Sequence, residues 1–150
     1  MSTFVYHARF EPGDESGIVV TFPDVPEAIT EGDNNAKARV MAEEALGLAL
    51  LSYPKRGLPL PEPRAHGGDL IPIIVAPDDA AKLAVLDAWR RANISKSDLA
   101  RRLGKDEKEV RRILDPMHPT KLSVLEAALR ALGRRLVIST AAAEGVVCNT

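Results

Sequence analysis

Apolar and polar residues alternate along the first part of the chain, as is typical of β-strands with one buried face. The alternation covers residues 4–10 and is followed by a segment of turn-forming residues, Glu11 to Gly17. The β-branched run from Ile18 to Phe22 is expected to pair back on the first strand as a hairpin. Two prolines soon after this run end the strand, because proline cannot donate to a β-ladder, and residues 28–31 predict a short third strand.

From Asn34 onward the apolar residues recur at helical spacing, which predicts a helix with Asp33 as its N-cap. This helix is expected to stop near Pro54. Residues 55–69 hold three prolines and a Gly-Gly pair, so they predict an extended connector. A further strand at residues 70–75 follows the connector. It could join either half of the molecule, because nothing in its composition decides between them.

The second half of the chain has the pattern of a small helical unit. Pro77 predicts the start of a helix that continues to about Arg91, because proline suits the first helical position. Gly133 predicts the end of the last helix, residues 136–138 predict a short strand, and residues 141–150 predict a loose tail. Three short helices in between are each predicted from a capping residue with an acid three positions later: Ser95 with Asp98, Asp106 with Glu109, and Ser123 with Glu126.

These elements predict an α+β protein with two units. The first, residues 1–69, has the order β-β-β-α, extended to β-β-β-α-β if the strand at 70–75 belongs to it. The second, residues 70–140, is all-α with short flanking strands.

Charge separates the two units more clearly than composition does. The net charge of −1 is the balance of −5 on residues 1–69 and +4 on residues 70–150. Residues 89–121 alone hold 10 basic and 5 acidic side chains. An acidic and a basic half suggest two different partners, and the basic half is a candidate for binding a phosphate backbone.

The segment from Lys96 to Leu114 predicts a DNA-binding helix-turn-helix. Such a pair needs apolar residues where its helices meet, a small residue where they cross and a residue tolerant of positive φ in the turn. Lys105, just after the turn, departs from the usual aliphatic residue. The pattern is met by Leu99 and Leu103 on the first helix, Ala100 at the crossing, Gly104 in the turn, and Val110, Ile113 and Leu114 on the second helix.

The second helix of this pair keeps a mostly basic outer face, which is expected to enter the major groove. Lys108 and Arg111 are predicted to reach base edges. One such unit makes few base contacts, so the protein is expected to bind its operator as a dimer or higher oligomer. The residues expected to contact phosphates or to lie beside them are Arg101, Arg102, Lys105, Arg112, Thr120 and Lys121.

Other chemistry finds little support in the residues. The single cysteine, Cys148, excludes an internal disulfide, and the histidines (His7, His66 and His118) have no metal-ligand spacing, so neither a metal nor a cofactor is expected. No apolar run is long enough to span a bilayer and the first residues lack the layout of a signal peptide, so a cytoplasmic location is expected.

The first half also resembles the HicB antitoxin family. The resemblance lies in GIVVTFPDVPEAITEGDNNAKARVMAEEAL at residues 17–46 and continues in ARRLGKDEKEVRRILDPMHPTKLSVLEAALRALGRRL at residues 100–136. It implies a degenerate ribonuclease-H-like fold for the first half, a complex with a small mRNA-cleaving toxin of the HicA type, and repression of the operon that encodes both. The residues that match the family motif, and so are candidates for toxin contact, are Phe22, Pro23, Asp24 and Pro26.

Ribonuclease-H chemistry needs clustered carboxylates that hold two divalent metals. The predicted strands at residues 3–10 and 18–22 contain no Asp or Glu, so the protein is not expected to be an enzyme. The alternative to an antitoxin is a one-component helix-turn-helix repressor whose first half senses a small molecule. No ligand-binding motif in the sequence favours it, but the residues alone do not exclude it.

Overall fold

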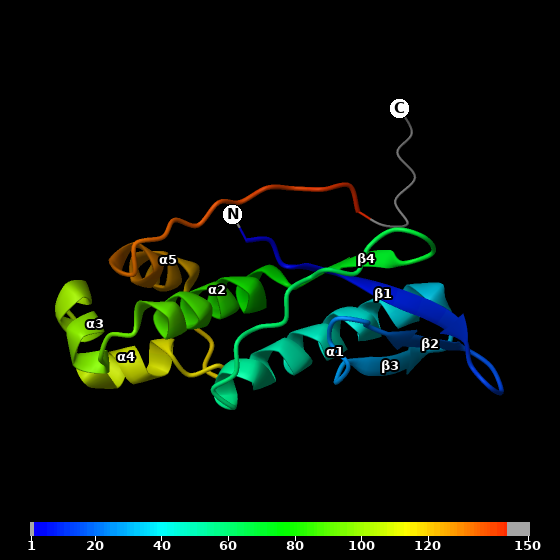
Figure 1. The fold of residues 1–150 in the computed structure, drawn as a ribbon, viewed down its shortest axis with the longest axis horizontal. Helices are drawn as coiled ribbons and strands as arrows, with labels where there is room; N and C mark the ends of the chain where they lie inside the picture. Colours follow the sequence, from blue (N-terminus) through cyan, green and yellow to red (C-terminus); the bar gives the residue numbers. More distant parts are fainter. Residues whose placement is uncertain (1, 144–150) are drawn as a thin grey trace.

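The computed structural model describes residues 2–143, and in these residues the fold is of the mixed α+β class that the sequence predicts (Figure 1). A four-stranded sheet and a long helix occupy one end of the molecule, and four shorter helices occupy the other. The strands are β1 (Val5–Pro12), β2 (Ile18–Thr21), β3 (Ile29–Gly32) and β4 (Ile71–Ile74), and the helices are α1 (Asn35–Lys55), α2 (Pro77–Ala92), α3 (Lys96–Leu103), α4 (Glu107–Ile113) and α5 (Leu122–Ala131).

The sheet has the order β3-β2-β1-β4, and every neighbouring pair is antiparallel. Strand β4 pairs with β1, with Tyr6 opposite Ile73, so it belongs to the sheet of the first half. The second strand predicted to flank the helices, at residues 136–138, is wrong for this chain. Those residues form no ladder with any described strand, although the outer edge of β4 is free, and Val137 and Ile138 remain 68% and 72% exposed.

Helix α1 covers one face of the sheet with a stripe of small and aliphatic side chains, including Ala38, Ala42 and Leu46, all fully buried. The approach to the sheet is close at Gly32, where a Cβ atom would lie 2.4 Å from the backbone nitrogen of Ala38. The N-cap is Asn34, which accepts from Lys37 N, and not Asp33 as predicted. Asp33 instead pairs with the Lys37 ammonium at 3.3 Å.

The connector between α1 and β4 has no regular structure, as predicted, but it is fastened to the sheet at two points. Tyr6 donates its hydroxyl to the carbonyl of Pro61 at 2.6 Å. The Asp24 carboxylate accepts from the backbone nitrogen of Ala65 at 2.7 Å. These two bonds hold the proline-rich segment along the sheet, and the chain therefore reaches β4 on the edge next to β1.

Helix α2 belongs to both halves of the molecule and lies between them (Figure 1). Leu83 is buried in the core formed by the sheet and α1. Ala81, Val85 and Ala88 are buried in a second core with α4 and α5. Because both cores include side chains of α2, the two halves cannot separate without exposing one apolar face of this helix to water.

Leu83→Ala is expected to lower the free energy of unfolding by about 2–5 kcal/mol, because the side chain is fully buried where the two halves meet. Urea denaturation followed by circular dichroism measures the change. Leu122→Ala is the matched control, since Leu122 is 50% exposed and its loss should cost less than about 1 kcal/mol. Equal effects of the two substitutions would contradict the shared-core account.

Candidate functional site

Helices α3 and α4 meet through a tight turn at Gly104, whose φ of +64° lies in the left-handed region that glycine adopts without strain. Leu99 and Val110 are fully buried where the helices pack, and Ala100 is 6% exposed at their crossing. The residues predicted to pack between the two helices therefore do so, except Ile113, which is buried in the second core against α2 and α5. A second layer, formed by Leu103, Leu114 and Trp89, lies half-buried around them.

Side chains cap the start of both helices as predicted. Ser95 Oγ accepts from Asp98 N at 3.0 Å at the start of α3. At α4, Asp106 and Glu109 form a reciprocal capping box. Such caps satisfy backbone donors that the helix leaves unpaired, and each contributes about 1 kcal/mol.

The third predicted cap, Ser123 at the start of α5, is wrong. Val124 N and Leu125 N both donate to the carbonyl of Lys121, at 3.0 Å each, so the helix begins at Leu122 and Ser123 lies inside it. Lys121 occupies the N-cap position without a side-chain bond.

The outer face of α4 carries the basic side chains that the sequence singled out. Lys108, Arg111 and Arg112 are all exposed, whereas Val110 and Ile113 on the same helix are buried. At about 100° of rotation per residue, Lys108 and Arg112 point most directly away from the packed face. Arg111 lies to one side, where it lines a groove of about 500 Å³ together with Lys96 and Trp89.

The flanking residues predicted to contact phosphates fall into two groups, those whose side chains face solvent and those that bond to another part of the fold. Lys121 is exposed and Lys105 is half-buried beside the turn. Arg101 forms an ion pair with Asp98 at 3.0 Å on the solvent side of α3. The other two have structural partners: Arg102 donates to the Ala131 carbonyl at 2.9 Å, and Thr120 Oγ1 accepts from a buried lysine.

That buried lysine, Lys82 on α2, is a residue that the sequence analysis missed. It is 4% exposed, and its ammonium donates to the carbonyls of Ile113 and Arg112 at 2.8 and 3.3 Å and to Thr120 Oγ1 at 2.7 Å. Burial lowers the pKa of Lys82 to about 8, against the opposing effect of the Asp115 carboxylate, so the group stays mostly protonated at neutral pH.

The ammonium of Lys82 therefore caps the C-terminal end of α4, where carbonyls are left without helical donors and the helix dipole favours a cation. It also fixes the loop between α4 and α5 through Thr120. The sequence did carry a signal, because Lys82 interrupts an apolar stripe with Leu86 and Trp89 at helical spacing. A lysine in such a position must find acceptors when it is buried.

The four candidates for toxin contact lie at the end of β2 and in the turn that follows. Phe22 is 2% exposed and packs in the first core, while Asp24 holds the connector through Ala65 N. Pro23 and Pro26 are exposed. Two members of the motif thus have a clear internal role, and the two prolines are left available at the surface.

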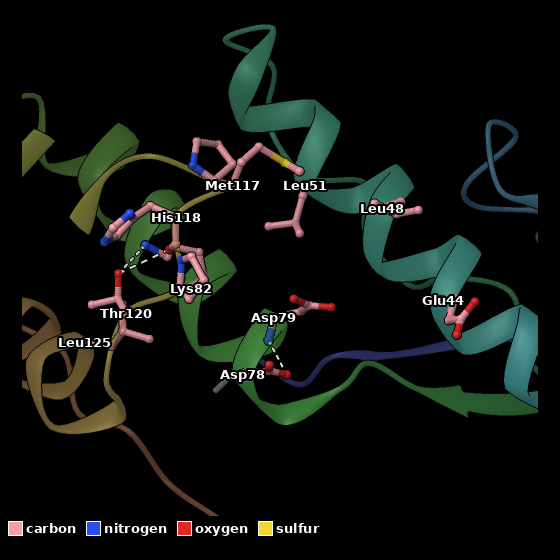
Figure 2. Close-up of a pocket in the computed structure, with 12 residues that line it drawn as sticks. Glu44, Leu48, Leu51, Asp78, Asp79, Lys82, Met117, His118, Thr120 and Leu125 are labelled. Carbon is pink, nitrogen blue, oxygen red and sulfur yellow. Dashed lines mark hydrogen bonds between the residues drawn. The ribbon is translucent and has the colours of Figure 1, made fainter. Parts of the chain in front are cut away.

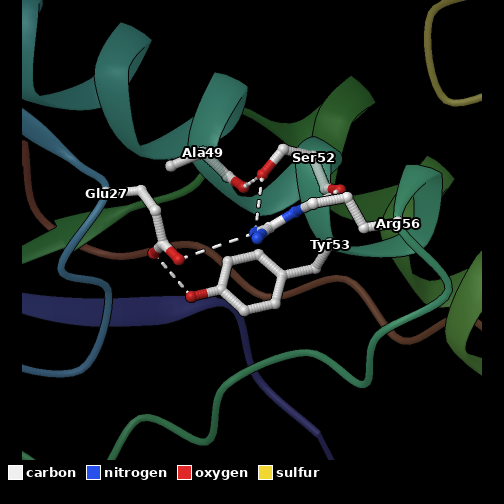
Figure 3. Close-up of polar contacts among 5 residues, drawn as sticks. All are labelled: Glu27, Ala49, Ser52, Tyr53 and Arg56. Carbon is white, nitrogen blue, oxygen red and sulfur yellow. Dashed lines mark hydrogen bonds and ion pairs between the residues drawn. The ribbon is translucent and has the colours of Figure 1, made fainter.

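A polar cluster fastens the end of α1 to the turn before β3 (Figure 3). Tyr53 donates its hydroxyl to Glu27 Oε2 at 2.6 Å, and Arg56 lies 3.5 Å from Glu27 Oε1 with its guanidinium over the Tyr53 ring. The hydrogen bond from Tyr53, assisted by the positive charge of Arg56, lowers the pKa of Glu27, whereas desolvation followed by the bond to Glu27 raises that of Tyr53 to about 12. The three side chains satisfy one another's hydrogen-bonding groups and charges, so the cluster has a structural role: it holds the end of α1 against the turn before β3.

Within residues 2–143 no three His, Cys, Asp or Glu side chains come together in a group able to hold a metal ion. The same part of the chain contains no helix long and apolar enough to cross a membrane. The predicted tail at 141–150 and Cys148 lie largely outside the described residues, which end at position 143.

Comparison with known proteins decides the family, although no family model matches the chain. An antitoxin, HicB 2 of Photorhabdus laumondii, is 37% identical over 133 residues, which are 87% of this chain and 92% of that protein. Antitoxin HicB of Escherichia coli K12 is 35% identical over 135 residues, 87% of this chain and 95% of its own length. The chain belongs to the HicB antitoxin family. Antitoxin HicB of Pseudomonas fluorescens, 30% identical, extends the match to 95% of this chain, so the likeness of this HicB protein to its relatives spans both halves.

Lys82→Met is expected to lower the free energy of unfolding by about 1–3 kcal/mol, because it removes the ammonium donor from the Ile113 carbonyl, the Thr120 hydroxyl and, at longer range, the Arg112 carbonyl while keeping a side chain of similar length. Urea denaturation at pH 7 measures the loss. Lys108→Met makes the same chemical change at an exposed site on α4 and should alter stability by less than about 0.5 kcal/mol. A Lys82 variant as stable as the control would refute the capping role.

Proposed function

We propose that this HicB protein neutralises a small mRNA-cleaving toxin of the HicA type through its acidic half and represses the operon that encodes both through its basic half. The observation that carries the proposal is the separation of charge along one chain, −5 on residues 1–69 and +4 on residues 70–150. Relatives named as antitoxins match the chain over both halves, while the pair α3–α4 presents a basic face on a packed, capped scaffold.

The DNA-binding half of the proposal treats α3, the Gly104 turn and α4 as a helix-turn-helix. The packing at the turn and the reciprocal cap at α4 support this assignment. In this arrangement α4 is the recognition helix, and Lys108 and Arg111 contact base edges in the major groove. The phosphate contacts come from Arg101, Lys105, Arg112 and Lys121, while Arg102 and Thr120 act indirectly by holding α5 and the α4–α5 loop.

The toxin-binding half rests on electrostatic complementarity. A protein that cleaves mRNA presents a basic surface to its substrate, and residues 1–69 carry a net charge of −5. We propose that this half is a degenerate ribonuclease-H-like fold without catalytic activity. The order β1-β2-β3-α1-β4 and the absence of carboxylates from β2 and from the first six residues of β1 support that proposal.

Binding two operator half-sites requires at least a dimer. The segment at residues 136–138 offers a means of association, because Val137 and Ile138 are exposed, β-branched and outside any ladder in the described chain. Pairing with the same segment of a second copy would satisfy its backbone groups and bury both side chains.

Co-expression tests the toxin-binding half directly. The tagged protein is expected to co-purify with the small basic protein encoded by the neighbouring reading frame and to restore growth to cells arrested by it. A one-component repressor would bind its operator, capture no small protein and rescue no cells, and that result would refute the antitoxin proposal. Metal-dependent cleavage of RNA by the purified protein would refute the claim that it has no catalytic activity.

Arg111→Ala is expected to weaken operator binding by about 1–3 kcal/mol and to leave toxin binding unchanged, since the substitution removes a proposed base contact on α4 and alters none of the four candidates for toxin contact. Fluorescence anisotropy with operator DNA measures the first effect and co-purification the second. Arg130→Ala is the matched control: Arg130 is exposed and paired with Glu126 on α5, and its loss should change operator affinity by less than about 0.5 kcal/mol. Parallel loss of toxin and operator binding in Arg111→Ala would mean that the two activities are not separable.

The double substitution Val137→Asp with Ile138→Asp is expected to shift the protein toward monomers and to weaken operator binding at least tenfold, by placing charges in the proposed contact between copies. Sedimentation velocity at about micromolar concentration resolves the species. Ala141→Asp, an exposed position three residues further along, serves as the control and should sediment as the unmodified protein does. An unchanged oligomer in the double variant would exclude this segment as the interface.

A further inference from the structure

One groove of the molecule has walls from both halves of the chain, and none of the contacts described so far fills it. It lies between the middle of α1, the start of α2 and the loop that joins α4 to α5, and has a volume of about 440 Å³ (Figure 2). Leu51 and Leu125, both nearly fully buried, contribute to its floor. Lys82 also lines it, but its ammonium is turned to the end of α4 and to Thr120.

Two large apolar side chains from different elements line this groove and are exposed. Leu48 on α1 is 63% exposed, and Met117 in the α4–α5 loop is 58% exposed. Apolar side chains of this size gain about 1.5–3 kcal/mol each when they are covered. A pair of them facing one groove is typical of a surface that another chain covers.

The rim of the groove is acidic. Glu44, Asp78 and Asp79 line it, and none of the three forms an ion pair with a lysine, arginine or histidine of the described chain. Asp79 is pressed against α1 so closely that a Cβ atom on Gly47 would lie 2.7 Å from its carboxylate. Desolvation and the neighbouring charge of Asp78 raise the pKa of Asp79, which means that a nearby cation would relieve an existing electrostatic cost.

Part of this acidity has a local explanation, because carboxylates in the first turn of α2 interact favourably with the positive end of the helix. That explanation does not extend to Glu44, which lies in the middle of α1, nor to the exposed Leu48 and Met117. The groove therefore combines an apolar interior with three carboxylates, a chemistry that is complementary to an apolar side chain flanked by lysine or arginine.

We propose that the groove between α1, the start of α2 and the α4–α5 loop is a docking site for a basic, apolar segment of the toxin. The inference rests on the proposed function, which supplies a partner with a basic surface, and it adds a place where that partner contacts both halves of the antitoxin at once. An apolar side chain of the toxin lies between Leu48 and Met117, and its lysine or arginine neighbours pair with Glu44, Asp78 and Asp79.

The test uses the full-length chain and, as the probe, the small basic protein encoded by the neighbouring reading frame. Leu48→Asp and Met117→Asp each place a charge in the lining of the groove, on two different elements, and each is expected to weaken binding of the probe at least tenfold in calorimetry or anisotropy. Val40→Asp is the matched control: Val40 is 59% exposed on the same helix but lies outside the groove, so its affinity should stay within about twofold. Two variants on separate elements keep the test decisive if one of them fails to fold, which circular dichroism reports.

Charge is tested by the double variant Asp78→Asn with Asp79→Asn. Its affinity for the probe is expected to fall about fivefold at low ionic strength, with a smaller loss at high salt, because exposed charge pairs are screened. A loss that is independent of salt would count against the electrostatic part of the proposal.

The outcomes separate this inference from the function on which it rests. If the unmodified protein binds no toxin, the proposed function fails and the docking site fails with it. If the unmodified protein binds but Leu48→Asp and Met117→Asp bind equally well, the function stands and the docking site is overturned. If the two substitutions instead reduce the oligomeric state of the isolated protein in sedimentation, the occupant is a second copy of this chain, which also overturns the proposal.

Discussion

Helix α2 has to satisfy two hydrophobic cores and one buried charge at the same time, and the rest of the structure depends on how it does so. Leu83 faces the sheet and α1, Val85 faces α5, and the ammonium of Lys82 reaches the last carbonyls of α4. These demands fall on different sides of one cylinder. The helix consequently cannot rotate or slide to improve one contact without breaking another, and the orientation of α4 is set by packing that begins in the opposite half of the chain.

The buried ammonium makes this arrangement specific as well as stable. Taking a charge out of water is costly, which offsets part of what the hydrogen bonds of Lys82 contribute to stability. An apolar side chain would, however, accept many nearby orientations of the end of α4, whereas three hydrogen bonds from one nitrogen accept very few. The α4–α5 loop is fixed by the same atom through Thr120. This restriction on the orientation of α4 keeps the basic side chains of its outer face in a fixed arrangement, as a binding surface requires.

Local chemistry let the sequence predict most of the elements, because each depends on residues close together in the chain. The caps of α3 and α4 and the left-handed turn at Gly104 follow from side chains within three or four positions of each other. Where several neighbouring residues offered a start, the prediction was out by one or two positions: Asn34 caps α1 in place of Asp33, and α5 begins ahead of Ser123. The error at α1 arises because Asp and Asn cap comparably well, so tertiary packing chooses between them. At α5 no side chain caps the helix, so the capping pattern could not indicate where it begins.

Contacts between distant parts of the chain could not be predicted from the sequence, because they depend on residues that are far apart along it. The pairing of β4 with β1 depends on the connector, which bonds to Tyr6 and Asp24 through backbone groups that any residue would provide. Asp24 is an example: it was a candidate for toxin contact because it matches the family motif, and its acceptor role toward Ala65, 41 positions along the chain, could not be read from the sequence.

The charge division of the chain is related to its architecture in a way that net charge alone does not reveal. Acidic side chains dominate the half with the sheet, but Asp78 and Asp79 continue that acidity onto the start of α2, the helix shared with the basic half. At the other end of the same helix, Arg90 and Arg91 begin the basic surface, and both form ion pairs with Asp87.

The surface charge therefore changes from negative to positive along a single helix of 16 residues. Acids lie at its N-terminus and bases at its C-terminus, which is the order that the helix dipole favours. One rigid element thus separates two electrostatic environments and joins them mechanically. A partner that contacts the acidic end of α2 would therefore bind the same helix whose Lys82 holds the end of α4.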